Sequence, residues 1–221
     1  SVSERRITGR EAMRGGDMAA EKTVICYGDS NTYGFDPRMG RPERLPRTVR
    51  WTGRLDARPG LKIINEGMNG REIPHTAAAF AYLDRVLERN AGADILFIML
   101  GTNDLFGFAN VTAGKIALRL QTMMDSVPLL GTYTGQGRRL IIAAPPLIDA
   151  MADDPFFGYQ SEQILTASAG LAAAYRTVAE KAGAEFVDTA RWQIPMTFDG
   201  VHFSEEGHRI FAGHMAALLE K

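Results

Sequence analysis

The feature that most constrains the fold is an apolar run, DILFIML at residues 94–100, in which polar and apolar residues do not alternate. A strand that is covered on both faces has this pattern, and such strands are typical of parallel sheets. Shorter apolar stretches predict four further strands, at residues 24–26, 61–65, 138–146 and 184–188. The segments between them predict helices at residues 51–60, 75–90, about 112–127, about 159–182, and after Ser204.

Strand and helix segments alternate along the whole chain, without internal repeats or low-complexity tracts. This order predicts an α/β fold, a three-layer α/β/α sandwich with about five parallel strands. In such sheets, ligands bind beyond the carboxyl ends of the strands. We therefore expect three polar stretches to meet at one edge of the sheet: GDSN at 28–31, GMNG at 67–70 and GTND at 101–104.

The composition fits one compact domain. The chain has 221 residues, of which 45% are hydrophobic and 23% are charged, which is enough for a sizeable core. We expect a single domain at residues 22–221 after an N-terminal extension or arm at residues 1–21. The formal net charge is -1 and the Lys and Arg residues are scattered, which argues against nucleic acid or an anionic membrane as the main partner.

The sequence also indicates a cellular location. No apolar run reaches the ~20 residues of a membrane span, and residues 1–22 carry charges instead of the hydrophobic region of a signal peptide. A cytoplasmic protein without a membrane partner is therefore expected. The single cysteine, Cys26, cannot form an internal disulfide, and no Cys/His spacing indicates zinc.

Ser30 lies in YGDSNTYGF, where a buried strand runs into a tight turn with glycines on both sides. If a helix begins at Ser30, backbone N–H groups and the positive end of that helix surround its hydroxyl. A serine hydroxyl attacks a carbonyl only when a base takes its proton and donors hold the developing oxyanion. Taken alone, a serine in this position is more often a turn or capping residue.

A base and its partner are found near the C-terminus, in DGVHFSEEGH. Asp199 precedes His202 by three residues, and in a loop this spacing lets the carboxylate fold back onto Nδ1 and leaves Nε2 free to face Ser30. The other histidines, His75, His208 and His214, are expected to be capping, surface or packing residues.

Four stretches of the chain, taken together, resemble those of the SGNH or GDSL-type serine hydrolases. They are GDSN at 28–31, GMNG at 67–70, GTND at 101–104 and DGVH at 199–202. The resemblance covers nearly all of the chain after Lys22 and implies the flavodoxin-like SGNH hydrolase fold. It also implies Ser30 as nucleophile, His202 as base and Asp199 as the partner that orients His202.

The resemblance further implies an oxyanion hole made by the backbone N–H groups of Ser30 and Gly70 and the side-chain amide of Asn103. Gly70 is preferred to Gly67, because the last small residue of the family's second block is the donor.

Two positions depart from the family's pattern. Asn31 stands where many members have Leu, and Asn69 stands where the second block often has Ser. We expect both departures to leave the mechanism intact and to limit what can be carried over about the substrate.

The stretches YGDSNTYGF, VRWTGRL, NEGMNGR and DGVHF are similar to those of the small bacterial arylesterases and acyltransferases of this family. Those proteins act on short-chain and aromatic esters, transfer acyl groups to alcohols or peroxide, and form oligomers. The resemblance implies a homo-oligomer in which the long loop at residues 34–50 takes part. The candidates for the acyl and alcohol pockets are Asn31, Phe35, Phe106, Phe157 and Val201.

The predicted function is hydrolysis of a small-molecule ester, short-chain or aryl, through an acyl-enzyme and without metal or cofactor. A carbohydrate acetylesterase, a thioesterase and a lysophospholipase are alternatives on the same fold. A metallophosphoesterase is disfavoured because few histidines lie near the acidic motifs. A noncatalytic module that binds an anion at GDSN is the alternative from another class, but it leaves Asp199 and His202 unexplained.

Overall fold

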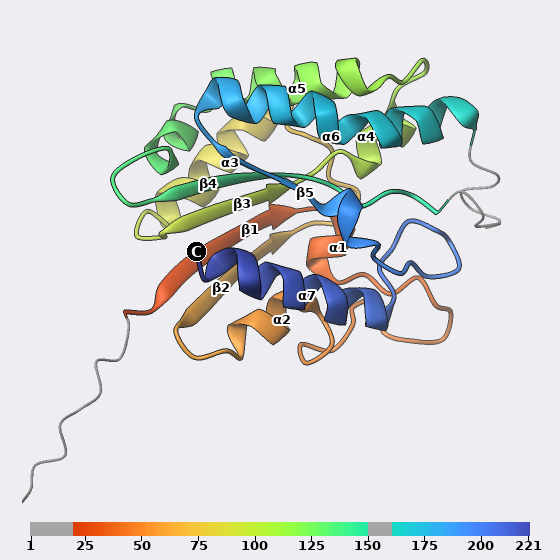
Figure 1. Cartoon of the computed structure of the whole chain (residues 1–221), viewed down its shortest axis with the longest axis horizontal. Helices are drawn as coiled ribbons and strands as arrows, with labels where there is room; N and C mark the ends of the chain where they lie inside the picture. Colours follow the sequence, from red (N-terminus) through yellow and green to blue (C-terminus); the bar gives the residue numbers. More distant parts are fainter. Residues whose placement is uncertain (1–19, 150–160) are drawn as a thin grey trace, which may run out of the picture.

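The computed structural model describes residues 20–149 and 161–221. Five strands form one sheet in which every neighbouring pair is parallel, in the order β2-β1-β3-β4-β5 (Figure 1). The strands are β1 (Lys22–Gly28), β2 (Leu61–Gly67), β3 (Ile95–Met99), β4 (Arg139–Ala144) and β5 (Glu185–Asp188). The predicted α/β fold with about five parallel strands is confirmed. Nearly all of the expected arm at residues 1–21 lies outside the described residues.

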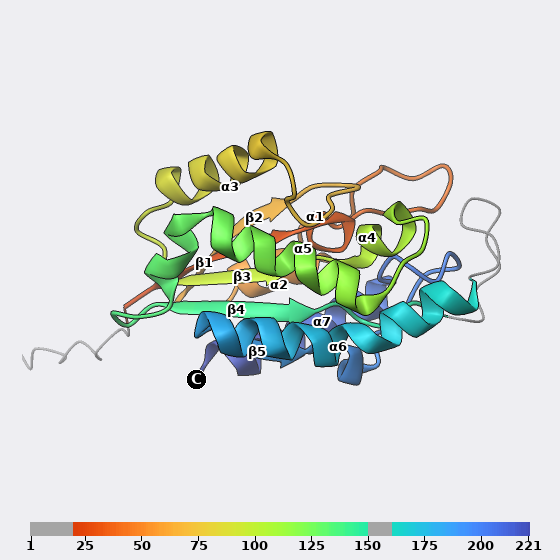
Figure 2. The ribbon, with the colours of Figure 1, turned by 90° about the horizontal axis from the view of Figure 1, so that it is seen from above.

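Helices cover both faces of the sheet and complete the three layers (Figures 1 and 2). One face carries α3 (Ala77–Arg89), α4 (Thr102–Gly107), α5 (Ala113–Ser126), the 3-10 helix η1 (Pro128–Tyr133) and α6 (Glu162–Ala182). The other face carries α2 (Trp51–Asp56) and α7 (Glu205–Leu219). Two short helices follow strands directly, α1 (Ser30–Tyr33) after β1 and η2 (Thr189–Trp192) after β5.

Side chains of the central strands supply the core on both sides of the sheet. In β1, Ile25 and Tyr27 join the cluster under α3, α5 and α6, whereas Val24 and Cys26 join the cluster under α2 and α7. Every residue of β3 is buried. Two covered faces explain why the apolar run in β3 does not alternate with polar residues.

Side-chain caps fix where most of the helices begin. Ser204 accepts a hydrogen bond from the N–H of Gly207 at the start of α7, as predicted, and Thr76 caps α3 in the same way. The helix predicted at residues 51–60 is shorter, because α2 ends at Asp56 before Pro59, where a helix is disfavoured.

The segment at residues 34–50 is an irregular loop, as predicted, but backbone hydrogen bonds fold it back on itself. The N–H of Asp36 donates to the carbonyl of Glu43 (2.8 Å), and the N–H of Leu45 donates to the carbonyl of Gly34 (2.9 Å). Because the loop follows α1 directly, it lies at the carboxyl edge of the sheet.

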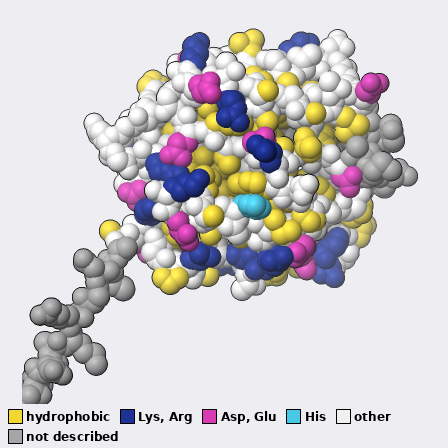
Figure 3. Space-filling model, viewed as in Figure 1, with side chains coloured by type: hydrophobic (Ala, Val, Ile, Leu, Met, Phe, Trp, Pro, Cys, Tyr) yellow, Lys and Arg dark blue, Asp and Glu magenta, His cyan; other side chains and the backbone are white. Residues whose placement is uncertain are grey.

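On the face shown in Figure 3, Lys and Arg side chains lie among Asp and Glu side chains. This mixture agrees with the scattered charges of the sequence. Across residues 20–149 and 161–221, none of the helices has the combination of length and apolar character that crossing a bilayer requires.

Candidate active site

The loops that follow β1, β2 and β3 meet the loop before α7 at one cavity, with a volume of about 460 Å³. Ser30, Gly70 and Asn103 line it from the first three loops, and Asp199 and His202 line it from the fourth. The polar stretches therefore meet at one edge of the sheet, as predicted from their positions after parallel strands.

Ser30 is the first residue of α1 and is only 7% exposed. The side chain of Asp29 caps this short helix by accepting a hydrogen bond from the N–H of Asn31 (2.9 Å). Glycine is required at two close approaches to α1: a Cβ on Gly28, before the turn, would collide with the Thr32 side chain, and a Cβ on Gly67, at the end of β2, would collide with the α1 backbone. The close approach of β1, α1 and β2 thus fixes where Ser30 stands.

His202 joins Ser30 to Asp199 through its two ring nitrogens. The distance from His202 Nε2 to Ser30 Oγ is 3.1 Å, and that from Nδ1 to Asp199 Oδ2 is 2.5 Å. When Nδ1–H donates to the carboxylate, Nε2 presents a lone pair to the serine hydroxyl. A base in this tautomer can accept the serine proton.

The carboxylate of Asp199 is held by further hydrogen bonds. Its Oδ1 accepts from the Thr197 hydroxyl (2.8 Å) and from the backbone N–H groups of Val201 and His202 (both 2.9 Å). Burial opposes ionisation of Asp199, but the hydrogen bonds and charge of His202, together with these N–H groups, outweigh burial and lower its pKa to about 2. Asp199 is therefore ionised at neutral pH and holds His202 in one orientation.

Three donors line the cavity near Ser30. Within the described part of the chain, the backbone N–H groups of Ser30 and Gly70 donate to no acceptor. The side-chain Nδ2 of Asn103 donates one hydrogen to the carbonyl of Arg71 (3.0 Å) and has a second hydrogen available. The N–H of Gly67 instead donates to Asn65 Oδ1 (2.9 Å), so Gly70 is the glycine of this loop with a donor available to a ligand.

A model of the GDSL-like lipase/acylhydrolase family matches residues 26–210. This span runs from β1 into α7 and includes Ser30, Gly70, Asn103, Asp199 and His202. The chain belongs to this family. Among curated proteins, none matches the chain.

Solved structures of two esterases resemble this GDSL-family chain. The native aryl esterase of M. smegmatis is 28% identical, with a TM-score of 0.75 over 90% of this chain and 98% of that chain. Est24, a carbohydrate acetylesterase from Sinorhizobium meliloti, is 30% identical, with a TM-score of 0.71 over 90% of this chain and 100% of that chain. The predicted resemblance to the GDSL family is thus confirmed, and its esterase members are among the neighbours.

The walls of the cavity in this GDSL-family protein are largely apolar. Phe35 lines the cavity, and its ring centroid lies 4.8 Å from that of His202. Four further residues line the cavity and were not predicted to do so: Pro37, Met39, Asn69 and Phe198. Their loops have no periodicity that would single them out, although the length of loop 34–50 was a signal that it has a function.

Two of the residues predicted for the pocket lie elsewhere. Val201 is buried in the hydrophobic core, and Phe106 is partly buried against the same core. Both lie in loops or short segments at the correct edge of the sheet, but their side chains pack inward. Phe157 lies outside the described residues.

Asn31 was also predicted to line the pocket, and the structure corrects this. Its side chain is buried and bonds to the backbone on both sides of His202: Nδ2 donates to the carbonyl of Val201 (3.0 Å), and Oδ1 accepts from the N–H of Phe203 (2.9 Å). Trp51 Nε1 donates to the Asn31 carbonyl (2.9 Å). Asn31 therefore connects α1 to the His202 loop instead of facing a ligand.

The other histidines take the structural positions that were expected. His75 is partly exposed, with Nδ1 2.8 Å from the carbonyl of Ile73. His214 stacks on Trp192 at 4.7 Å between ring centroids, and His208 is fully buried in α7.

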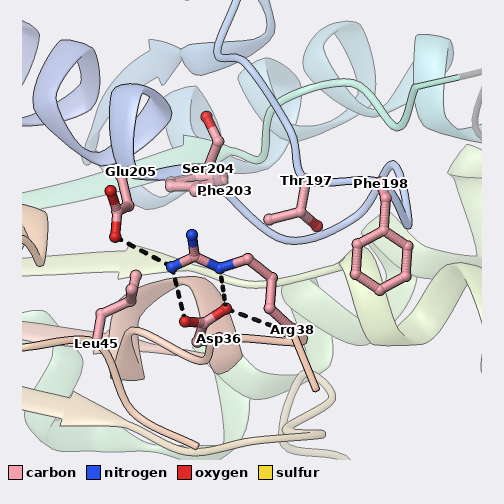
Figure 4. A pocket seen from close by; sticks show the side chains of 8 residues that line it. All are labelled: Asp36, Arg38, Leu45, Thr197, Phe198, Phe203, Ser204 and Glu205. Atoms are coloured by element: carbon pink, nitrogen blue, oxygen red, sulfur yellow. Dashed lines mark hydrogen bonds and ion pairs between the residues drawn. The ribbon is translucent and has the colours of Figure 1, made fainter. Parts of the chain in front are cut away.

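A salt-bridge cluster ties the long loop to α7 beside the cavity (Figure 4). The guanidinium of Arg38 bonds to both carboxylate oxygens of Asp36 (2.8 Å each) and to Glu205 Oε1 (3.0 Å). These residues and Phe198 line a side cavity of about 150 Å³. Phe198 also lines the main cavity, so the side cavity with this cluster lies next to the site.

Within residues 20–149 and 161–221, no group of three or more His, Cys, Asp or Glu side chains is arranged to hold a metal ion.

Proposed function

We propose that this protein is a serine esterase that hydrolyses short-chain or aryl carboxylic esters through an acyl-enzyme. The observation that carries the proposal is the chain of hydrogen bonds from Ser30 Oγ through His202 to Asp199, at 3.1 and 2.5 Å. This hydrogen-bonded chain borders a cavity that is also lined by Ser30 and Gly70, whose backbone N–H groups have no acceptor among the described residues. These are the parts that acyl transfer through a serine requires.

In the first step, Ser30 Oγ attacks the ester carbonyl carbon while His202 Nε2 takes the hydroxyl proton. The negative charge that develops on the carbonyl oxygen is held by the N–H groups of Ser30 and Gly70 and by Asn103 Nδ2. When the intermediate collapses, the bond from carbon to the leaving oxygen breaks, and His202 returns the proton to the alcohol. Asp199 holds the imidazolium that forms in between.

In the second step, water attacks the acyl-enzyme with His202 again as the base, which releases the acid and restores Ser30. An alcohol or peroxide in place of water gives acyl transfer. The apolar walls made by Phe35, Pro37, Met39 and Phe198 support such a nucleophile, because organic alcohols partition into an apolar cavity better than water does.

The same walls support a short or aromatic ester as substrate. A cavity of about 460 Å³ has room for a small ester, and aromatic and aliphatic side chains gain free energy by covering apolar groups.

A carbohydrate acetylesterase is the second candidate, because Est24 is 30% identical to this chain over the full length of Est24 and 90% of this chain. It would use the same Ser30 chemistry with a sugar as leaving group. Activity on acetylated sugars that exceeds activity on phenyl acetate would favour this candidate.

We also propose that the protein is a homo-oligomer. Met39 and Phe198 are 90% and 52% exposed at the cavity, and a second copy that covers them would bury apolar surface. Light scattering coupled to size-exclusion chromatography tests this, and a monomer at all concentrations would exclude it.

The deciding experiment compares wild type with Ser30→Ala on p-nitrophenyl esters from acetate to palmitate. We expect activity on the short chains that is lost in the variant, together with a covalent adduct between Ser30 and an organophosphonate. Activity that survives in Ser30→Ala would overturn the serine mechanism. A preference for long chains would move the assignment to a lipase or thioesterase.

A further inference from the structure

A second cavity, of about 370 Å³, adjoins the catalytic cavity at Gly70, which lines both. It is formed by Tyr27 of β1, the loop after β2 and the first turns of α3. Figure 2 shows that α3 starts at the carboxyl edge of the sheet and runs away from it. Because Gly70 has no side chain, it places no side chain between the two cavities.

Arg71 lines the second cavity although it is only 6% exposed. Its Nη1 donates to the carbonyls of Gly28 (2.9 Å) and Glu66, and its guanidinium stacks on the ring of Tyr27 at 4.0 Å. Among residues 20–149 and 161–221, the N–H groups of Nε and Nη2 meet no acceptor, and no carboxylate lies within 4.0 Å of the guanidinium. Arg71 is thus a largely buried cation that forms no ion pair with the described residues.

A buried charge is costly unless an opposite charge or a full set of hydrogen bonds compensates for it. The one carboxylate that lines the cavity, that of Glu72, is bound to Arg119 at 3.2 Å. The ring of Tyr27 stabilises the cation only in part. The Nε and Nη2 donors of Arg71 are therefore available to an acceptor group of a ligand that enters this cavity.

The start of α3 adds positive potential to the same cavity. This helix has 13 residues, and Thr76, its cap, lines the cavity. Thr76 Oγ1 takes the N–H of Ala79 (3.2 Å), which leaves the N–H groups of Ala77 and Ala78 without an acceptor in the described chain. A guanidinium with two free N–H groups and a helix N-terminus together form a setting that favours oxyanions.

We propose that this cavity is an anion subsite in which Arg71 binds a carboxylate or phosphate group of the ester substrate. The proposal rests on the proposed function and narrows it: an anionic substrate would place its ester at Ser30 and extend across Gly70 to Arg71. The apolar walls hold one part of the substrate and the guanidinium holds the charged end.

Ala79 offers a test that leaves Arg71 in place. It lines the cavity at the third position of α3, so Ala79→Glu puts a carboxylate into the same cavity as the guanidinium, and Ala79→Gln is a neutral control of the same size. Glu and Gln are both favourable three residues after a Thr cap, so both variants should fold.

Inorganic phosphate is the first probe, because its binding does not require catalysis. A ligand that binds only the folded state raises Tm. We expect phosphate, at constant ionic strength, to raise Tm of wild type and Ala79→Gln but not of Ala79→Glu. No response in wild type, or equal responses in the two variants, would overturn the subsite.

Esters with and without a charge are the second probe. The pairs are meta-carboxyphenyl acetate with phenyl acetate, and the p-nitrophenyl monoester of succinate with p-nitrophenyl butanoate. For at least one pair, we expect the ratio of kcat/KM, charged over neutral, to be about 10- to 100-fold lower in Ala79→Glu than in Ala79→Gln. Unchanged ratios in both pairs would exclude a role of the subsite in substrate binding. Absence of Ser30-dependent activity on every ester would contradict the proposed function instead, and the phosphate result would still decide the anion site.

Discussion

At the level of single residues, Asn31 links the helix that carries Ser30 to the loop that carries His202. Both polar atoms of its buried side chain bond to backbone next to His202, at 3.0 and 2.9 Å. Ser30 and His202 are 172 residues apart in the chain, so the distance between them depends on such contacts. In the proposed mechanism, Asn31 is therefore a positioning residue that does not touch substrate.

Replacing Asn31 with Leu removes both hydrogen bonds and keeps the number and branching of the side-chain heavy atoms. We expect kcat to fall about 10- to 100-fold, because a reacting group displaced by about 1 Å can cost that much, whereas KM changes little. In a His202→Ala background, Asn31→Leu should not lower kcat any further, because Asn31 acts through His202.

The control for Asn31→Leu is Thr189→Val, which also removes a buried hydrogen bond, from Thr189 Oγ1 to the carbonyl of Ala144 (2.5 Å). Both variants should lower Tm, but the control should keep kcat. A control that loses as much kcat as Asn31→Leu would show that lost stability, and not position, explains the effect.

Asn103→Ala removes one of the three donors that line the cavity. Loss of one oxyanion donor typically lowers kcat about 10²–10³-fold, and we expect a loss in this range with Tm close to wild type, because Asn103 is partly exposed. Steady-state kinetics on p-nitrophenyl acetate measure it. Wild-type turnover in this variant would exclude Asn103 from the oxyanion hole.

At the level of elements, the salt bridge between Arg38 and Asp36 holds loop 34–50 in place. The Asp36 side chain is 4% exposed, and the Arg38 side chain is 33% exposed. Burial opposes ionisation of Asp36 less than the Arg38 hydrogen bond favours it, so the pKa of Asp36 is lowered. Arg38 is thus the counter-ion of a buried carboxylate.

Arg38→Met should leave Asp36 without its cationic partner, although the backbone N–H of residue 38 still donates to Oδ1 (3.1 Å), and should loosen the wall that Phe35 and Met39 provide. We expect KM to rise several-fold and Tm to fall, because an unpaired buried carboxylate is destabilising. Glu205→Gln is the matched control: its carboxylate is 52% exposed, and such exposed pairs contribute about 0–1 kcal/mol. Equal changes of KM and Tm in Arg38→Met and Glu205→Gln would contradict the claim that Asp36, and not Glu205, is the partner through which Arg38 holds the loop.

The elements themselves could be predicted because their signals are local. The apolar run of β3 and the Ser204 cap of α7 depend on neighbours in sequence, so both were located correctly. The side-chain direction of Val201 and the two contacts of Asn31 depend on segments far apart in the chain, and no periodicity encodes them. For the same reason, Arg71 was not recognised: its burial against Tyr27 exists only after β1 and β2 pair.

At the level of the whole molecule, His208 connects two elements of one layer. It lies fully buried in α7 and accepts a hydrogen bond at Nδ1 from the N–H of Trp51, at the start of α2 (3.3 Å). Burial, with the nearby charges of Arg54 and Arg50, lowers the pKa of His208 from 6.5 to about 3. The folded protein therefore keeps this ring neutral.

Because the pKa of His208 differs between the folded and the unfolded protein, the free energy of unfolding depends on pH. Between about pH 6.5 and 3, the unfolded state binds a proton at His208 that the folded state does not, so stability is fully present above 6.5 and falls as pH decreases. For one proton, the unfolding free energy changes with pH by at most about 1.4 kcal/mol per pH unit. Asp29 acts in the opposite direction below pH 6, because burial raises its pKa to about 6, but its shift from 3.8 is smaller.

His208→Asn should remove this acid sensitivity, because an amide oxygen can still accept from the N–H of Trp51 but does not titrate. Urea unfolding from pH 8 to 5 measures the effect: the gap in unfolding free energy between wild type and variant should shrink as pH falls below 6.5. His214→Asn is the control, since His214 is exposed and stacks on Trp192, and it should keep the wild-type slope. If His208→Asn also keeps that slope, the acid sensitivity of the fold does not come from the buried ring between α2 and α7.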